Sequence, residues 1–169
     1  MPWHLLSPTR YRIFHAEPLL ALDLGSEIKW HQRHLKHLKK QAQRPNLFHE
    51  HWGYLHKTPQ ERERHFQEHV LEQIPYHSKR LADHIRRREL ITAFFSPRAI
   101  NDLRGLASER GAFPDYLVYD KERKSVFFLN KNPTTAQQIW AHEVQAKKLA
   151  TVKSFGDLRV PANGAGDQR

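Results

Sequence analysis

Two polar residues in the second half of the chain have types and a spacing suited to phosphodiester hydrolysis. Asp115 stands just before a short apolar run, and Lys131 stands just after a second one. Hydrolysis needs a divalent cation held by carboxylate oxygens, and a nearby ammonium can orient water or stabilise phosphate charge. If the two runs form a hairpin, Asp115 comes close to Lys131. The spacing is therefore compatible with a site for a hard, magnesium-like cation at this end of the hairpin.

These residues belong to a longer pattern of about fifty residues. Pro114-Asp115 precedes the first run, Lys131 ends the second, and Gln137 with Trp140 forms Gln-x-x-Trp on an expected helix. The pattern resembles the VRR-NUC branch of the PD-(D/E)xK nuclease superfamily. The resemblance implies a restriction-endonuclease-like core that acts on DNA with magnesium or manganese. It also implies roles: Asp115 binds metal, Lys131 positions water or phosphate, and Gln137 orients the site.

One position departs from the family pattern. The family carries Glu-x-Lys, which places a carboxylate two residues before the lysine on the same face of the strand, and this chain has Leu129 there. Shifting the register by one residue puts Asn130 in the carboxylate position and Asn132 in the lysine position. Leucine cannot bind a metal and an amide is a weak neutral ligand, so magnesium affinity should fall.

A carboxylate from elsewhere could replace the missing one. The candidates are Glu143 on the following helix, Glu122 in the hairpin turn, and Glu68 or Glu72 on an upstream helix. The family's N-terminal helix often supplies a glutamate, so we assign Glu68 as a further metal ligand beside Asp115. The alternative is that catalysis has been lost.

Thirteen histidines suggest a rival metal chemistry. His65 and His69 are four residues apart in an expected helix, and His31, His34 and His37 repeat every three residues in another. Imidazoles four apart on a helix can chelate zinc. However, HFQEH lacks the glutamate that directly follows the first histidine in zinc peptidases. Such spacings also arise by chance in a histidine-rich chain, so zinc is not expected.

The charge of the chain favours a polyanionic partner. Its 169 residues include 28 Lys and Arg against 18 Asp and Glu, a net charge of +10. Cations of this kind neutralise phosphates and release counterions. The strongest cluster is expected to bind nucleic acid, although a solvated helix face explains it equally well: Lys79, Arg80, Arg86, Arg87 and Arg88. The basic face of an earlier helix, from Lys29 to Lys40, offers a second contact.

Composition excludes several other classes of protein. The absence of cysteine removes disulfides, thiolate metal sites and cysteine nucleophiles. No apolar run approaches the ~20 residues that span a bilayer, so we expect no membrane partner and a cytoplasmic or nucleoid-associated protein. Seven glycines and no Walker-type loop argue against a nucleotide cofactor.

Helix signals divide the first two thirds of the chain. Ser26 is expected to begin a helix that ends before Pro45, and residues 45–57 look like an aromatic connection. Thr58-Pro59 begins the next helix, which Pro75 should end before another helix follows to about Leu90 or Ala93. Ser96-Pro97 begins a helix that closes at Gly111.

After Gly111 the spacing of apolar residues changes from a helical pattern to short apolar runs. The apolar runs Tyr116–Tyr119 and Val126–Asn130 predict a hairpin. The stretch Asn132-Pro133-Thr134-Thr135 then breaks the strand and caps a helix to about Leu149. A last strand is expected near Thr151–Phe155. Residues 1–25 should form an extended arm or short strands.

Together these features predict an α+β fold with a small mixed sheet flanked by helices, a restriction-endonuclease-like core carrying an N-terminal helical or arm extension. We expect residues 1–57 to form a basic, aromatic arm and helix, 58–160 the nuclease-like core, and 161–169 a disordered tail. The function expected by resemblance is a metal-dependent deoxyribonuclease of structured or branched DNA, with a homodimer as an option. The alternatives are an inactive nuclease-fold protein that binds nucleic acid or acts as an adaptor, and a protein-binding inhibitor or assembly module.

Overall fold

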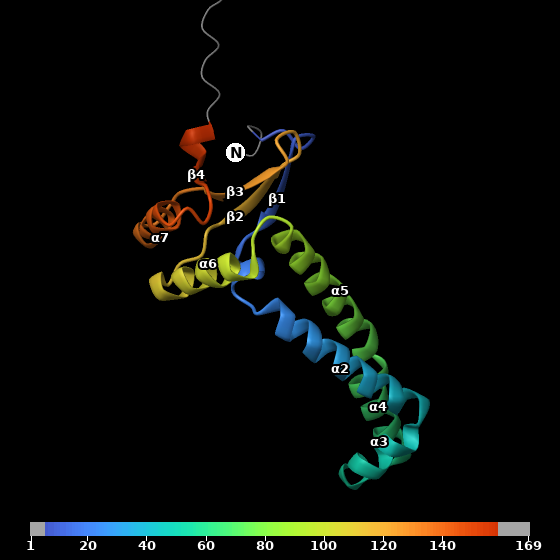
Figure 1. Cartoon of the computed structure of the whole chain (residues 1–169). Helices are drawn as coiled ribbons and strands as arrows, with labels where there is room; N and C mark the ends of the chain where they lie inside the picture. The colour runs from blue at the N-terminus through green and yellow to red at the C-terminus, as the bar shows by residue number, and fades with distance from the viewer. Residues whose placement is uncertain (1–5, 159–169) are drawn as a thin grey trace, which may run out of the picture. The chain divides into compact units, whose positions relative to one another are not determined.

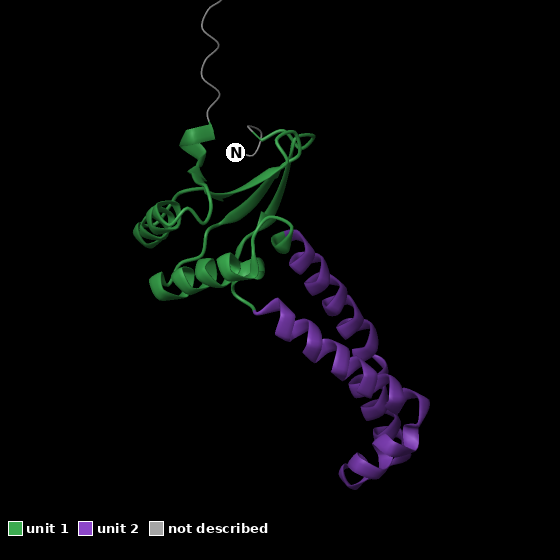
Figure 2. Ribbon diagram, viewed as in Figure 1, with its two compact units in different colours: residues 1–22, 91–169 green, residues 23–90 purple. Residues whose placement is uncertain are grey.

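The computed structural model describes residues 6–158, which form two compact units. Unit 1 combines the start of the chain, up to Leu22, with everything from Ile91 onward, and unit 2 is the continuous segment Asp23–Leu90 (Figures 1 and 2). The first five residues and the predicted disordered tail, 161–169, lie outside the described residues.

Unit 1 contains a four-stranded sheet in the order β1-β2-β3-β4. Strands β1 (Tyr11–His15), β2 (Tyr116–Asp120) and β3 (Ser125–Asn130) are antiparallel neighbours, and β4 (Val152–Ser154) pairs parallel to β3. Helix α7 (Thr135–Ala146) makes the crossover that a parallel pair requires. The predicted α+β class with a small mixed sheet is therefore confirmed, and so is the hairpin after Gly111.

Both faces of this sheet are apolar. On one face, Phe128 meets Phe95 and Trp140 at ring-centroid distances of 5.7 and 5.5 Å. On the other face, Leu129 packs with Val118, Phe127 and neighbouring residues. Because side chains alternate along a strand, the consecutive residues Phe128 and Leu129 enter different clusters. The remaining elements of unit 1 are α1 (Glu17–Leu20), α6 (Pro97–Arg110) and the 3-10 turn η4 (Phe155–Leu158).

Unit 2 is helical throughout. Its elements are α2 (Leu24–Gln43), α3 (Pro45–Trp52), the 3-10 turn η2 (Gly53–Leu55), α4 (Pro59–Phe66), the π-helical turn η3 (Gln67–Leu71) and α5 (Gln73–Thr92), of which the last two residues belong to unit 1. Leu38, Phe48, Phe66 and Val70 form one buried cluster of this unit.

Several predicted helix starts are correct because the capping side chains act as expected. The hydroxyl oxygens of Thr58, Ser96 and Thr134 each accept a hydrogen bond from the backbone N–H three residues later. Gly111 ends α6 in the left-handed conformation, at φ 67°.

Three local predictions were wrong. Helix α2 is capped by Asp23, whose carboxylate accepts bonds from both the backbone N–H and the hydroxyl of Ser26. The expected connection after Pro45 is mostly the helix α3, since proline at the first helical position can begin a helix as well as end one. Pro75 does not break a helix: it lies in the first turn of α5, where its missing N–H costs no helical bond, and the irregularity falls earlier, at η3.

The boundaries of the two units also differ from those expected at residues 57 and 58. Strand β1 lies early in the chain but pairs with β2, and its register joins Tyr11 to Asp120 and His15 to Tyr116. The helical unit is therefore an insertion between two neighbouring strands of one sheet. None of the helices within residues 6–158 combines the length and the apolar character that a membrane span requires.

Candidate functional site

Asp115 lies at the mouth of the β2–β3 hairpin, where its carboxylate is held by two hydrogen bonds. The backbone N–H of Lys131 donates to Oδ2 at 2.8 Å, and the side-chain amide of Gln137 donates to Oδ1 at 2.9 Å. The backbone N–H of Asp115 in turn donates to Oδ1 of Asn130 at 3.1 Å. The structure thus brings Asp115, Lys131 and Gln137 together, as the pattern predicts, but the group of Lys131 that contacts Asp115 is its backbone N–H.

Gln137 is positioned by the first turn of α7. Its Oε1 accepts from the N–H of Thr134 while the Thr134 hydroxyl accepts from the Gln137 N–H, a reciprocal capping box. Its Nε2 donates to both the Asp115 carboxylate and the carbonyl of Phe113. One turn later Trp140 is fully buried, with its indole N–H 3.4 Å from the carbonyl of Leu103. The Gln-x-x-Trp pair therefore joins the helix to both the acid and the core.

The register of the hairpin decides which residue stands beside Asp115. Tyr116 pairs with Leu129, so the next pair outward is Asp115 with Asn130. Paired residues share a face, and Asn130 is buried against Asp115 while Leu129 enters the opposite cluster with Phe127. Asn130 and not Leu129 therefore stands beside Asp115, and a neutral amide occupies the place where a second carboxylate would be needed.

An open pocket of about 560 Å³ reaches Asp115 from the side of β1. His15 and Glu17 line the same pocket, and the Ala16 N–H between them donates to the Asp115 carbonyl at 3.2 Å. Glu17 was not among the carboxylates considered from the sequence. The signal that could have found it is the pairing of β1 with β2, which no local pattern reveals. Within residues 6–158, Asp115 belongs to no group of three closely placed metal ligands.

The other candidate carboxylates are differently engaged. Glu143 forms an ion pair with Arg110, which holds the pKa of that carboxyl below its usual value. Glu122 is exposed and lies 3.1 Å from Nη1 of Arg10. Glu68 and Glu72 belong to unit 2, so the assignment of Glu68 as a metal ligand with Asp115 stays a prediction.

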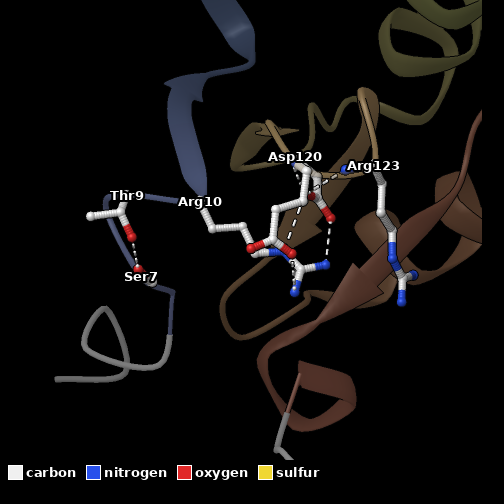
Figure 3. A network of polar contacts seen from close by, with 6 residues as sticks. Ser7, Thr9, Arg10, Asp120 and Arg123 are labelled. Carbon is white, nitrogen blue, oxygen red and sulfur yellow. Dashed lines mark hydrogen bonds and ion pairs between the residues drawn. The ribbon is translucent and has the colours of Figure 1, made fainter.

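The opposite end of the hairpin holds a second ordered acid, Asp120 (Figure 3). Its carboxylate accepts from Nε and Nη2 of Arg10 at 3.1 and 3.0 Å, and from the backbone N–H groups of Glu122 and Arg123. The hydrogen bond from Arg10 is the main reason that the pKa of Asp120 is lowered. This network ties the hairpin turn to Arg10, just before β1. Both carboxylate oxygens of Asp120 accept hydrogen bonds from the protein itself, which is a structural role.

The basic residues of unit 2 lie on two helices with different patterns. On α5, Arg86 is paired with Asp83 at 3.5 Å, and Arg86 and Arg88 point about 200° apart around the helix. On α2, four exposed cations follow each other at steps of four, three and four residues, which places them along one side: Lys29, Arg33, Lys36 and Lys40. We call these four residues the α2 stripe. Nucleic-acid binding by Lys79, Arg80, Arg86, Arg87 and Arg88 stays a prediction.

The histidines considered for zinc do not form the group that the spacing suggests. His65 meets His69 with ring centroids 4.3 Å apart, but its Nδ1 lies 2.6 Å from Nε2 of His56. Burial is the main reason that the pKa of His65 is lowered. Among residues 6–158, the one group of three potential ligands that meets metal-binding spacing contains Glu27, His31 and His84. Only His31 of these three was singled out from the sequence.

In comparisons with known proteins, no family, no curated protein and no solved structure matches this chain.

Proposed function

We propose that this protein binds DNA through the α2 stripe and that its sheet core is a nuclease-like scaffold that does not hydrolyse DNA at Asp115. The observation that carries the proposal is an uninterrupted basic segment. Between Glu27 and Glu50 the chain has six Lys and Arg and no acidic residue. Four of the six form the exposed α2 stripe.

The spacing of the stripe suits a phosphate backbone. Lys29 and Lys40 are eleven residues apart, which is about 16 Å along the helix axis. Several phosphates of one DNA strand fall within this length, so the four cations can neutralise neighbouring charges and release counterions. On α5, by comparison, Asp83 and Glu89 are interspersed with the cations, and Asp83 already neutralises Arg86.

Loss of hydrolysis is supported by the surroundings of Asp115. A two-ligand carboxylate site for magnesium needs a second acid on the same face, and Asn130 stands there. Leu129, which the resemblance would replace by glutamate, is fully buried among apolar side chains. The Asp115 oxygens accept hydrogen bonds from Lys131 and Gln137, so the acid already has a role in closing the hairpin onto α7.

Fluorescence anisotropy of a labelled duplex, titrated with the full chain over a range of salt, tests DNA binding. Replacing the α2 stripe by glutamines should weaken binding at least tenfold and lower the slope of log K against log salt by about 3–4. The matched control removes an equal number of positive charges, four, from exposed positions of unit 1. Its substitutions to glutamine are at Arg98, Arg123, Lys124 and Lys147.

The control variant should change the affinity much less than the stripe variant. Equal losses in the two variants would mean that net charge alone drives binding, and the proposal would fail. A loss confined to a Lys79→Gln, Arg86→Gln variant would move the interface to α5. Absence of binding by the unmodified chain in low salt would remove DNA as the partner.

A metal-dependent nuclease is the second candidate, and the pocket at Asp115 favours it. His15 and Glu17 line this pocket together with Asp115, so the carboxylate of Glu17, the first residue of α1, could compensate for Asn130. If this site is active, manganese should support cleavage of branched DNA by the unmodified chain, and both Asp115→Ala and Glu17→Ala should abolish it. Cleavage that persists in both variants would come from another site or a contaminant.

A further inference from the structure

Within the described part of the chain, a buried histidine in the middle of α5 makes no hydrogen bond. His84 is fully enclosed, and neither of its ring nitrogens meets a donor or acceptor among residues 6–158. A buried imidazole normally makes at least one hydrogen bond, because leaving it unpaired forfeits the bonds it had with water. Both ring nitrogens of His84 therefore remain available to a ligand.

Two residues of α2 face His84 with suitable chemistry. One ligand atom each from Glu27, His31 and His84 lies within 4.8 Å of the other two. Glu27 and His31 are four residues apart, so they extend from the same side of α2. The ligand atoms of a tetrahedral zinc ion lie about 3.3 Å apart, for bonds of about 2.0–2.1 Å. Small side-chain rotations would bring the three atoms into that geometry.

The environment keeps these imidazoles neutral, which is the form that binds a metal. Burial is the main reason that the pKa values of His31 and His84 are lowered. Arg80 adds to both shifts and Arg87 to that of His84, so a cation here would meet two guanidinium groups and one carboxylate, Glu27. Because the two guanidinium groups repel a cation and only one carboxylate attracts it, the imidazole ligands must supply most of the binding energy.

A neighbouring histidine completes the arrangement. Nδ1 of His77 lies 2.9 Å from Nδ1 of His31. Metal-bound histidines commonly pass their other ring N–H to such an outer partner, which fixes the ring and its tautomer. His77 is itself buried and packs against His34, whose ring stacks on Trp30.

We propose that Glu27, His31 and His84 bind a zinc-class divalent ion that joins α2 to α5. His31 gives the ion its Nε2, because its Nδ1 meets His77, and the fourth position is open to water. This assignment reverses the expectation from sequence that zinc is absent. It is independent of DNA binding, since the α2 stripe contains none of these residues.

The test uses the full chain without a histidine tag, stripped of metal by a chelator. Elemental analysis after dialysis against zinc, and the visible absorption of tetrahedral cobalt, report stoichiometry and geometry. We expect one bound ion and a rise in melting temperature on adding zinc. His84→Leu and His31→Leu should each weaken binding by at least tenfold. The controls His37→Leu, at an exposed position of α2, and His65→Leu should bind as the unmodified chain does.

Each other outcome counts against the site. The proposal would be overturned if the unmodified chain retained clearly less than one zinc ion per chain. It would also be overturned if the His84→Leu variant bound zinc as tightly as the unmodified chain. Loss of the ion in His65→Leu alone would assign it to the other histidine group. Circular dichroism without metal checks that the variants fold. If His84→Leu does not fold, Glu27→Gln at a partly exposed position provides the same tenfold test.

Discussion

The polar clusters around Asp115 and His84 differ in whether their hydrogen bonds are satisfied. Asp115 has a donor for each carboxylate oxygen, and its neighbours Asn130 and Gln137 are bonded as well. His84 is more deeply buried, and neither of its ring nitrogens has a hydrogen-bond partner among residues 6–158. A polar group that the fold itself satisfies can be explained by stability alone, whereas an unsatisfied one costs stability until a ligand pairs with it. The cluster that resembles a catalytic site is thus the better explained as structural.

The largest effect is expected from restoring the acid that the resemblance calls for. Leu129→Glu should cost at least about 4 kcal/mol, because it places a carboxyl in a dry apolar cluster. Asn130→Asp should cost much less, since an aspartate oxygen can still accept from the Asp115 N–H. Urea unfolding of the two variants compares them directly. If Leu129→Glu lowered the free energy of unfolding only slightly, Leu129 and not Asn130 would stand beside Asp115.

This contrast shows what the sequence could and could not predict. Caps at Thr58, Ser96 and Thr134, and the meeting of Asp115 with Gln137, follow from residues close together in the chain or from a pattern of turn, strand and helix. The choice between Leu129 and Asn130 needed the strand register, and both registers fit the local sequence. The approach of His84 to His31 depends on how two helices pair across a gap of more than fifty residues, which no periodicity encodes.

Removing the acid at the satisfied cluster should destabilise unit 1. Asp115→Ala leaves the Lys131 N–H without its acceptor and removes one of the two acceptors of the Gln137 amide, at a cost of about 1.5–3 kcal/mol. The loss should be the same with and without manganese, because the carboxylate serves the fold. Thermal unfolding in chelator and in manganese measures it. A cost that appears only when manganese is present would support the nuclease candidate instead.

At the His84 cluster we expect a substitution to raise the stability of the metal-free protein instead of lowering it. His84→Leu replaces two unpaired nitrogens by apolar atoms of similar volume, so the metal-free protein should become more stable by about 1–3 kcal/mol. In excess zinc the difference should shrink or reverse, because the unmodified chain binds zinc more tightly and gains more stability from it. Urea unfolding in chelator and in zinc gives both values. Destabilisation in chelator would show that His84 has a partner in the folded protein and would end the contrast with Asp115.

The smallest effect, but the one that separates the two clusters most cleanly, is the response to mild acid in chelator. Burial lowers the pKa values of His31, His77 and His84 in the folded protein, whereas in the unfolded chain they titrate near 6.5. Above about pH 6.5 these groups are neutral in both states, and below it the unfolded chain binds protons that the folded protein does not, so stability falls as the pH drops toward the folded pKa values. Each such group adds a slope of up to about 1.4 kcal/mol per pH unit. In unit 1 the pKa of Asp120 is lowered, so its contribution is lost only below about pH 4.

Hydrogen exchange at pH 7.5 and 5.5, corrected for the intrinsic rates, should accordingly show α2 and α5 losing protection first. The sheet of unit 1 should keep its protection over the same range. In the His84→Leu variant the loss in α2 and α5 should be smaller, because one of the three titrating groups is gone. Equal loss in the sheet and the helices would contradict the expected difference in acid sensitivity between the two units.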